Sequence, residues 1–153
     1  MGAEAKLKDL GIELPAPPQP VGNYVAGVRV GNLLFMSGCG PRQPDGSSLT
    51  GKVGETMDVE EARAAARVTG LNMLANIRSI LGSLDKVQRV VKVLGMVNAV
   101  PGFTQQPKVI DGFSDLFVEL YGEAGRGARS AVGMGSLPFQ IPVEVEMILE
   151  VGD

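Results

Sequence analysis

The last 13 residues contain a period-two pattern that constrains the fold more than any other segment. In a β-strand successive side chains point to opposite faces, so one face of residues 141–150 is apolar and the other carries Glu144 and Glu146. Helices cannot cover that second face without burying unpaired charge. The pattern therefore predicts an α+β two-layer sandwich, with helices on one face of the sheet only. The open face is left to line a cleft or to pack on another subunit. The apolar set is Ile141, Val143, Val145, Met147 and Leu149.

Two helices are expected to cover the sheet. Asp58 and Glu61 have the spacing of a capping box, so we expect a long helix from there to Gly82. A second helical stripe spans residues 107–121. Gly112 inside it costs about 1 kcal/mol relative to alanine, which indicates close packing or the approach of a ligand.

The remaining segments are read from turn residues and apolar runs. Residues 25–30 and 33–37 are predicted strands joined by a primed turn at Gly31-Asn32. Residues 40–56 are predicted to be a loop, and the apolar run 87–100 a central strand covered on both sides. One or two helical turns are expected at residues 4–10, followed by a proline-rich extended arm. We expect residues 1–20 to be an N-terminal arm and residues 21–153 a single domain.

The segment from Gly127 to Glu146 is the strongest candidate for a functional site. We expect Arg129 on a short strand, a turn at residues 135–138, and a returning strand with Glu144 and Glu146. A hairpin of this kind would place a fixed cation beside a carboxylate. A guanidinium can bind a ligand carboxylate with two parallel hydrogen bonds. The alternative is a structural ion pair between Arg129 and a glutamate, with Glu144 as one candidate.

Composition excludes several classes of function. The chain has no histidine and one cysteine, which makes a zinc or copper site improbable and removes the usual general base. A net charge of −3, a pI of about 5.0 and the lack of a basic run argue against nucleic acid as a partner. No apolar run is long enough for a membrane span and no signal-peptide pattern is present, so we expect a cytoplasmic protein without a membrane partner.

Three motifs resemble those of one family. Ala128-Arg129-Ser130, Leu137-Pro138 and Glu144-Val145-Glu146 resemble a family pattern of Ala-Arg-Ser, Leu-Pro and Glu-x-Glu, and two upstream pieces agree. The family is the YjgF/YER057c/UK114 family, also called Rid, RidA-like or reactive-intermediate deaminase, and often labelled "endoribonuclease L-PSP". The upstream pieces are Gly22-Asn23-Tyr24-Val25-Ala26-Gly27 and Phe35-Met36-Ser37-Gly38.

The resemblance implies a fold, an assembly and a reaction. It implies a chorismate-mutase-like fold with a mixed sheet and two helices on one side, and a homotrimer with ligand sites between subunits. The implied enzyme is a hydrolase that converts enamines or imines of 2-amino acids to 2-keto acids and ammonia. No cofactor or metal is needed, because an imine carbon is already electrophilic.

The resemblance also assigns roles to residues. Arg129 would hold the substrate carboxylate and Glu144 would position the attacking water. Tyr24, Ser37 and backbone groups near Cys39 and Ala131 would complete the site. In the family a glutamine often stands at position 39 and a cysteine often at position 131. Asp111, near a position where the family often has asparagine, is a further candidate.

Two other functions remain open at this stage. A trimeric, non-enzymatic binder of small carboxylates, or a regulatory protein, would use Arg129 in the same way. An endoribonuclease would agree with the family label, but the missing histidine and the acidic pI weigh against it.

Overall fold

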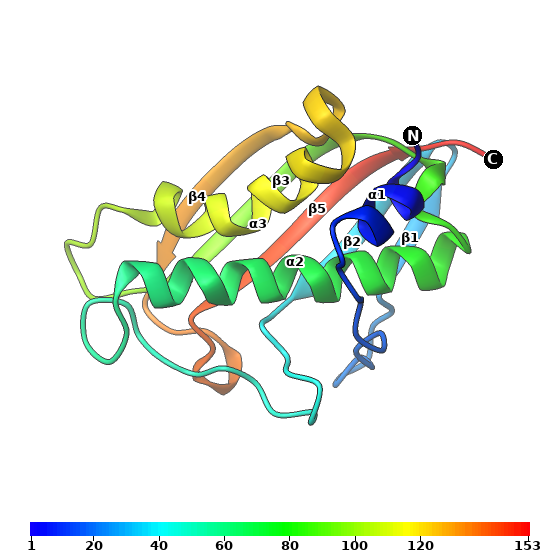
Figure 1. The fold of residues 1–153 in the computed structure, drawn as a ribbon. Coiled ribbons are helices and arrows are strands. Elements are labelled where there is room, and N and C mark those ends of the chain that lie inside the picture. The colour runs from blue at the N-terminus through cyan, green and yellow to red at the C-terminus, as the bar shows by residue number, and fades with distance from the viewer.

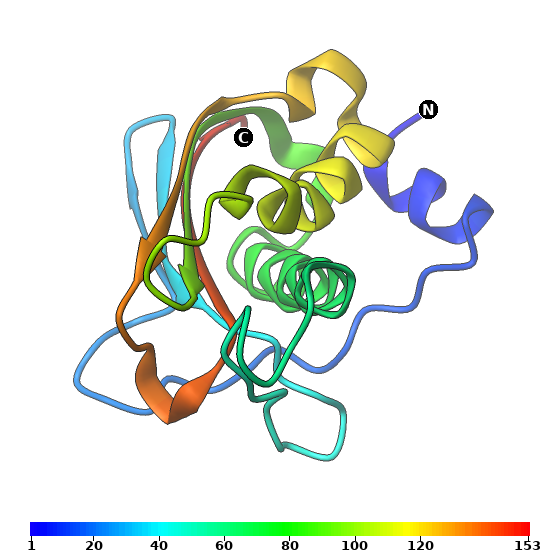
Figure 2. The same cartoon turned by 90° about the vertical axis from the view of Figure 1, so that its left-hand side faces the viewer.

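The computed structural model describes residues 1–153 and consists of two layers. A five-stranded sheet forms one layer, and helices α2 and α3 lie side by side on one of its faces (Figures 1 and 2). The elements are α1 (Ala3–Asp9), β1 (Gly27–Val30), β2 (Leu33–Cys39), α2 (Val59–Leu81), η1 (Leu84–Lys86), β3 (Val87–Asn98), α3 (Gln106–Tyr121), η2 (Gly122–Gly125), β4 (Ala128–Met134), η3 (Pro138–Gln140) and β5 (Val143–Val151). The predicted α+β class and the placement of two helices on one face are confirmed.

The strand order is β1-β2-β5-β3-β4, and only the β3–β4 pair is parallel. The predicted hairpin between the strands of Arg129 and Glu144 is therefore wrong, because β3 lies between β4 and β5. The physical reason is that β5 pairs along both its edges, with β2 and with β3. Strand β4 cannot pair with β5, because both edges of β5 are occupied. It pairs instead with the free edge of β3, which it reaches after the α3 crossover.

Both long helices begin and end near the predicted residues. The Asp58 side chain accepts a hydrogen bond from the Glu61 amide, and the Glu61 side chain accepts one from the Asp58 amide, so the capping box is complete. Gly82 ends α2 with a left-handed φ of 81°. The stripe of α3 is buried as predicted, including Phe113 and Phe117, whose rings stack at 4.8 Å between centroids.

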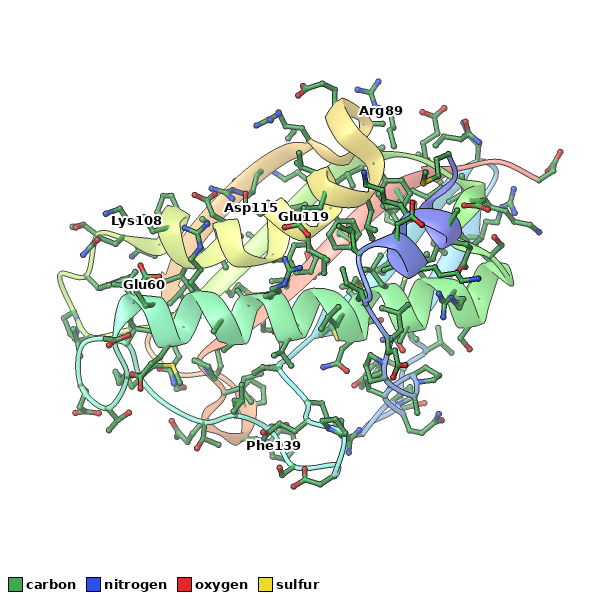
Figure 3. All side chains as sticks on the ribbon, viewed as in Figure 1. Glu60, Arg89, Lys108, Asp115, Glu119 and Phe139 are labelled. Carbon is green, nitrogen blue, oxygen red and sulfur yellow. The ribbon has the colours of Figure 1, made fainter.

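Helices α2 and α3 touch at Gly112. A Cβ atom at this position would collide with the carbonyl oxygen of Arg63 on α2, so close packing rather than a ligand explains this glycine. The contact is bordered by ion pairs of Arg63 with Asp115 at 2.7 Å and of Arg67 with Glu119 at 3.0 Å. Asp115 and Glu119 can be followed along α3 in Figure 3.

Strands β1 and β2 form the predicted hairpin around Gly31-Asn32, but only Gly31 has a positive φ, of 61°. Strand β3 is covered by helices on one face only, which corrects the expectation of cover on both. The uncovered face carries apolar side chains from several strands and is not uniformly polar. Its exposed apolar residues include Val28, Phe35 and Val132. No helix of the chain is both long and apolar enough to cross a membrane.

The N-terminal segment is attached to the domain at α1. Ala3 and Leu7 belong to the core, and the Glu4 carboxylate accepts hydrogen bonds from the Arg78 guanidinium at 2.6 and 3.0 Å. Residues 11–20 contain no regular element and continue along the helical layer toward the end of the sheet (Figure 1). The predicted helical turns are present as α1.

Candidate functional site

A cavity of about 800 Å³ lies where β2 ends and β5 begins. The end of β2 contributes Ser37, Gly38 and Cys39, and β5 contributes Glu144 and Glu146. Three irregular segments complete the walls: residues 18–24, parts of the loop 40–50, and η3 with Phe139. The paired strands β2 and β5 form the floor of the cavity, and the connecting segments form its rim.

Two carboxylates share this cavity. Glu144 is half-buried, and its pKa is raised above the ordinary value of 4.5, first because burial penalises the charged form and second because Glu146 lies nearby. Gly38 makes this placement possible, since a Cβ atom there would lie 2.8 Å from Oε2 of Glu144. A cavity carboxyl group whose pKa is raised is a candidate to accept a proton and return it during a reaction.

Ser37 and Tyr24 line the cavity, but their hydroxyl groups already have partners within the chain. The Ser37 hydroxyl donates to the Val25 carbonyl at 2.5 Å, and the Ser37 amide donates to the Ala26 carbonyl at 2.9 Å. The Tyr24 hydroxyl accepts from the Val21 amide at 3.4 Å. These contacts hold the segment before β1 against the end of β2.

Cys39 lies in the same wall with its side chain buried. Burial and the neighbouring Glu144 raise the pKa of this thiol to about 12. The group is therefore a neutral thiol at physiological pH and not an activated nucleophile. Its backbone, at the bulged end of β2, is the part that can contact a ligand.

Arg129 lies in a different place, between β4 and α3. Its Nη1 donates to the Asp111 carboxylate at 2.7 Å and to the Ser114 hydroxyl at 3.2 Å. Its Nη2 donates to the Pro107 carbonyl at 3.4 Å, and Nε has no hydrogen-bond partner in the chain. The side chain is 23% exposed. The ion pair has formed with Asp111 rather than with a glutamate of β5.

Of the candidates from the sequence, Tyr24, Ser37, Cys39 and Glu144 line one cavity. Arg129 and Asp111 line a smaller cavity of about 190 Å³ instead. Ala131 lies on β4 opposite Gly95 of β3, on the helix-covered side, and lines neither cavity. Within one copy of the chain, Arg129 and Glu144 therefore line different cavities.

Several cavity residues were not found from the sequence. Phe139 has a positive φ of 57°, and the sequence has neither glycine nor asparagine at this position to predict it. Asn76 faces the cavity from α2. Asn72, one turn earlier, donates to the carbonyl groups of Gly40 and Arg42 and fixes the start of the loop. A buried asparagine in an apolar helix stripe is a signal that could have marked the loop contact.

No group of three or more Cys, Asp or Glu side chains is arranged to hold a metal ion.

A family model described as "YjgF/chorismate_mutase-like, putative endoribonuclease" matches residues 4–150. The chain belongs to the YjgF family. The match begins inside α1 and ends in β5, so it includes both cavities and residues 4–20 of the arm. The resemblance inferred from the motifs is confirmed.

Relatives of this YjgF-family chain cover nearly its full length. Protein TCP17 of Trypanosoma cruzi is 43% identical over 97% of this chain and 94% of its own. A 2-iminobutanoate/2-iminopropanoate deaminase of Dermatophagoides farinae is 30% identical over 90% of this chain and 93% of its own. The solved structure of the protein Atu1372 from Agrobacterium tumefaciens, a protein of unknown function, superimposes with a TM-score of 0.87. It is 44% identical and covers 97% of this chain and 91% of that one.

Proposed function

We propose that the protein is a cofactor-free hydrolase that deaminates enamines or imines of 2-amino acids to 2-keto acids and ammonia. The observation that carries the proposal is the half-buried Glu144, whose pKa is raised, in a cavity lined by exposed backbone of a strand end. The similarity to a relative named as a 2-iminobutanoate/2-iminopropanoate deaminase supports the same reaction class.

In this proposal Glu144 acts on water. The carboxylate removes a proton while the water oxygen bonds to the imine carbon, giving a tetrahedral carbinolamine. The proton then passes from Glu144 to the nitrogen. The Glu144 carboxylate next takes the proton of the carbinolamine hydroxyl and passes it to the same nitrogen, so that the C=O bond forms as the C–N bond breaks and ammonia leaves. Backbone groups of Gly38 and Cys39 would position the imine nitrogen, and the backbone of Ala131 would reach it only from the neighbouring copy that supplies Arg129. Tyr24 and Ser37 would support that wall.

Arg129 would bind the substrate carboxylate, which requires a second copy of the chain. The separation of Arg129 from Glu144 within one chain supports a site between subunits. The exposed apolar side chains on the open face of the sheet support a partner surface there. We propose a homotrimer, and light scattering should then give about three times 16.0 kDa. A monomer at micromolar concentration would contradict a site between subunits.

Two other functions use the same residues. A trimeric binder of small carboxylates, or a regulatory protein, would need Arg129 but not the proton transfer by Glu144. The raised pKa of Glu144 favours the enzyme over the binder. An endoribonuclease would need a surface for the phosphate backbone, and the net charge of −3 disfavours it. RNA cleavage that survives purification and disappears in Arg129→Ala would favour the nuclease.

Ammonia and keto-acid release from freshly generated 2-aminoacrylate tests the proposal. Glu144→Gln should lower turnover more than binding, whereas Glu150→Gln, on the same face of β5, should leave turnover unchanged. Arg129→Lys should lose nearly as much as Arg129→Ala, because an ammonium cannot form the bidentate contact. The expected loss is about 2–4 kcal/mol, or about 30- to 1000-fold in kcat/KM. Loss of the oligomer in Arg129→Ala, with activity following the folded fraction, would make Arg129 a structural residue.

A further inference from the structure

The rim of the cavity presents an aromatic ring to solvent. Phe139, on η3, is 72% exposed, which is more than any other aromatic side chain of the chain (Figure 3). It lines the same cavity as Glu144 and Glu146. A large apolar side chain left exposed beside a cavity is expected to contact something that enters the cavity.

The backbone holds this ring in place at an energetic cost. Phe139 and Gln140 have φ of 57° and 58°, and they are the only residues other than glycine with positive φ. Such a conformation persists only where neighbouring contacts enforce it. The Gln140 carbonyl accepts from the Gly51 amide at 2.9 Å, and the Gln140 amide donates to the Leu137 carbonyl at 3.1 Å. The backbone that carries the exposed ring is therefore held in this conformation.

The arm provides further apolar surface. Pro18, Pro20 and Val21 line the cavity together with the Tyr24 ring. The arm is fixed at one end by α1 and at the other by the Ser37 hydrogen bonds to the carbonyl groups of Val25 and Ala26. Proline restricts the backbone between these points, so the wall is kept in place with little loss of entropy on binding.

We propose that the cavity selects substrates with a bulky apolar side chain, contacted by Phe139 and by residues 18–21. This inference rests on the proposed deaminase function and specifies its substrate class. The part of the site that one chain forms measures about 800 Å³, which leaves room for a side chain larger than the methyl group of the alanine-derived imine. An aromatic or branched side chain would fill the apolar part of the cavity, while the imine carbon lies at Glu144.

Two imines made in situ by an amino-acid oxidase, one from alanine and one from phenylalanine, test the selectivity. The wild-type protein should have the higher kcat/KM on the phenylalanine-derived imine. Phe139→Ala should lower that value by about tenfold or more and change the alanine-derived value by less than about twofold. Leu10→Ala, an exposed apolar residue outside the cavity, is the matched control and should change neither value.

Calorimetric binding of the product analogues pyruvate and phenylpyruvate separates this proposal from the deaminase proposal. Tighter binding of phenylpyruvate that is lost in Phe139→Ala supports the apolar walls even if no imine is hydrolysed. Hydrolysis of both imines at equal efficiency, unchanged in Phe139→Ala, overturns the selectivity and leaves the deaminase intact. Loss of the oligomer in Phe139→Ala, with both substrates affected equally, also overturns it, since the ring would then be a contact between subunits.

Discussion

The ion pair between Asp111 and Arg129 should weaken the binding of carboxylate ligands, and removing its charge should strengthen that binding. In Asp111→Asn the amide oxygen can still accept the hydrogen bond from Nη1, now 2.7 Å long, so the guanidinium keeps its orientation. The second carboxylate that competes for the same cation is then gone. Asp111→Asn therefore removes the charge at position 111 and keeps the hydrogen bond to Arg129.

The expected size follows from Coulomb's law. A ligand carboxylate that contacts the same planar guanidinium from the Nε side would lie ~5 Å from the Asp111 carboxylate. The Asp111 side chain is 42% exposed, so an effective dielectric constant of ~40 to ~80 applies. The repulsion is then about 1 kcal/mol, and its removal should tighten binding about fivefold.

Calorimetric titration with pyruvate at low ionic strength measures this change. Asp115→Asn is the matched control, because Asp115 lies one turn further along α3 and pairs with Arg63 instead. The gain in Asp111→Asn should shrink as salt is added. An affinity that stays unchanged, or that falls as in Arg129→Ala, would refute the reasoning and leave Arg129 as a structural partner of α3.

Three further predictions concern the cavity and the helical layer. Activity that depends on ionised Glu144 should fall as the pH drops through its raised pKa, and Glu146→Gln should move this acidic limb of the kcat profile to lower pH by removing the nearby charge. Cys39 in the folded protein should react with iodoacetamide about a thousandfold more slowly than an ordinary thiol, because its pKa is about 12 instead of 9.0. In denaturant the same thiol should react at the normal rate. Fast labelling of the native protein would contradict the burial of the thiol. Gly112→Ala should lower the free energy of unfolding by about 1–3 kcal/mol and the Tm by several degrees, because its Cβ meets the Arg63 carbonyl, whereas Gly135→Ala, with open space around it, should be neutral in the same thermal melt.

The elements that the sequence predicted well have local causes. The capping box at Asp58 and the left-handed Gly82 define α2, and the alternation from residue 141 defines β5. Each of these signals depends on residues within a few positions of one another. The order of the strands does not, because it depends on which edges are already paired. Arg129 and Glu144 are close in sequence, which suggested a hairpin between their strands. The pairing of β3 with β5 prevents that hairpin.

The cavity was partly predictable for the same reason. Glu144 and Ser37 were found because strand ends and motifs mark them. The contribution of Phe139 depends on a left-handed backbone that hydrogen bonds from distant residues enforce. The alternative expectation of an ion pair between Arg129 and a glutamate is wrong, because the guanidinium pairs with Asp111 on α3. The family resemblance named Asp111 as a candidate, whereas its contact with Arg129 could be seen only in the fold.

The position of β3 between β4 and β5 has a genetic consequence under the proposed assembly. Each site would take Glu144 from one copy and Arg129 from its neighbour, so two defective chains could repair each other. A mixture of Arg129→Ala and Glu144→Gln chains, unfolded together and refolded, would recover intact pairs at about one site in four. Neither variant alone could do so. Two alleles that are each inactive when expressed singly would then restore part of the activity when they are expressed in the same cell.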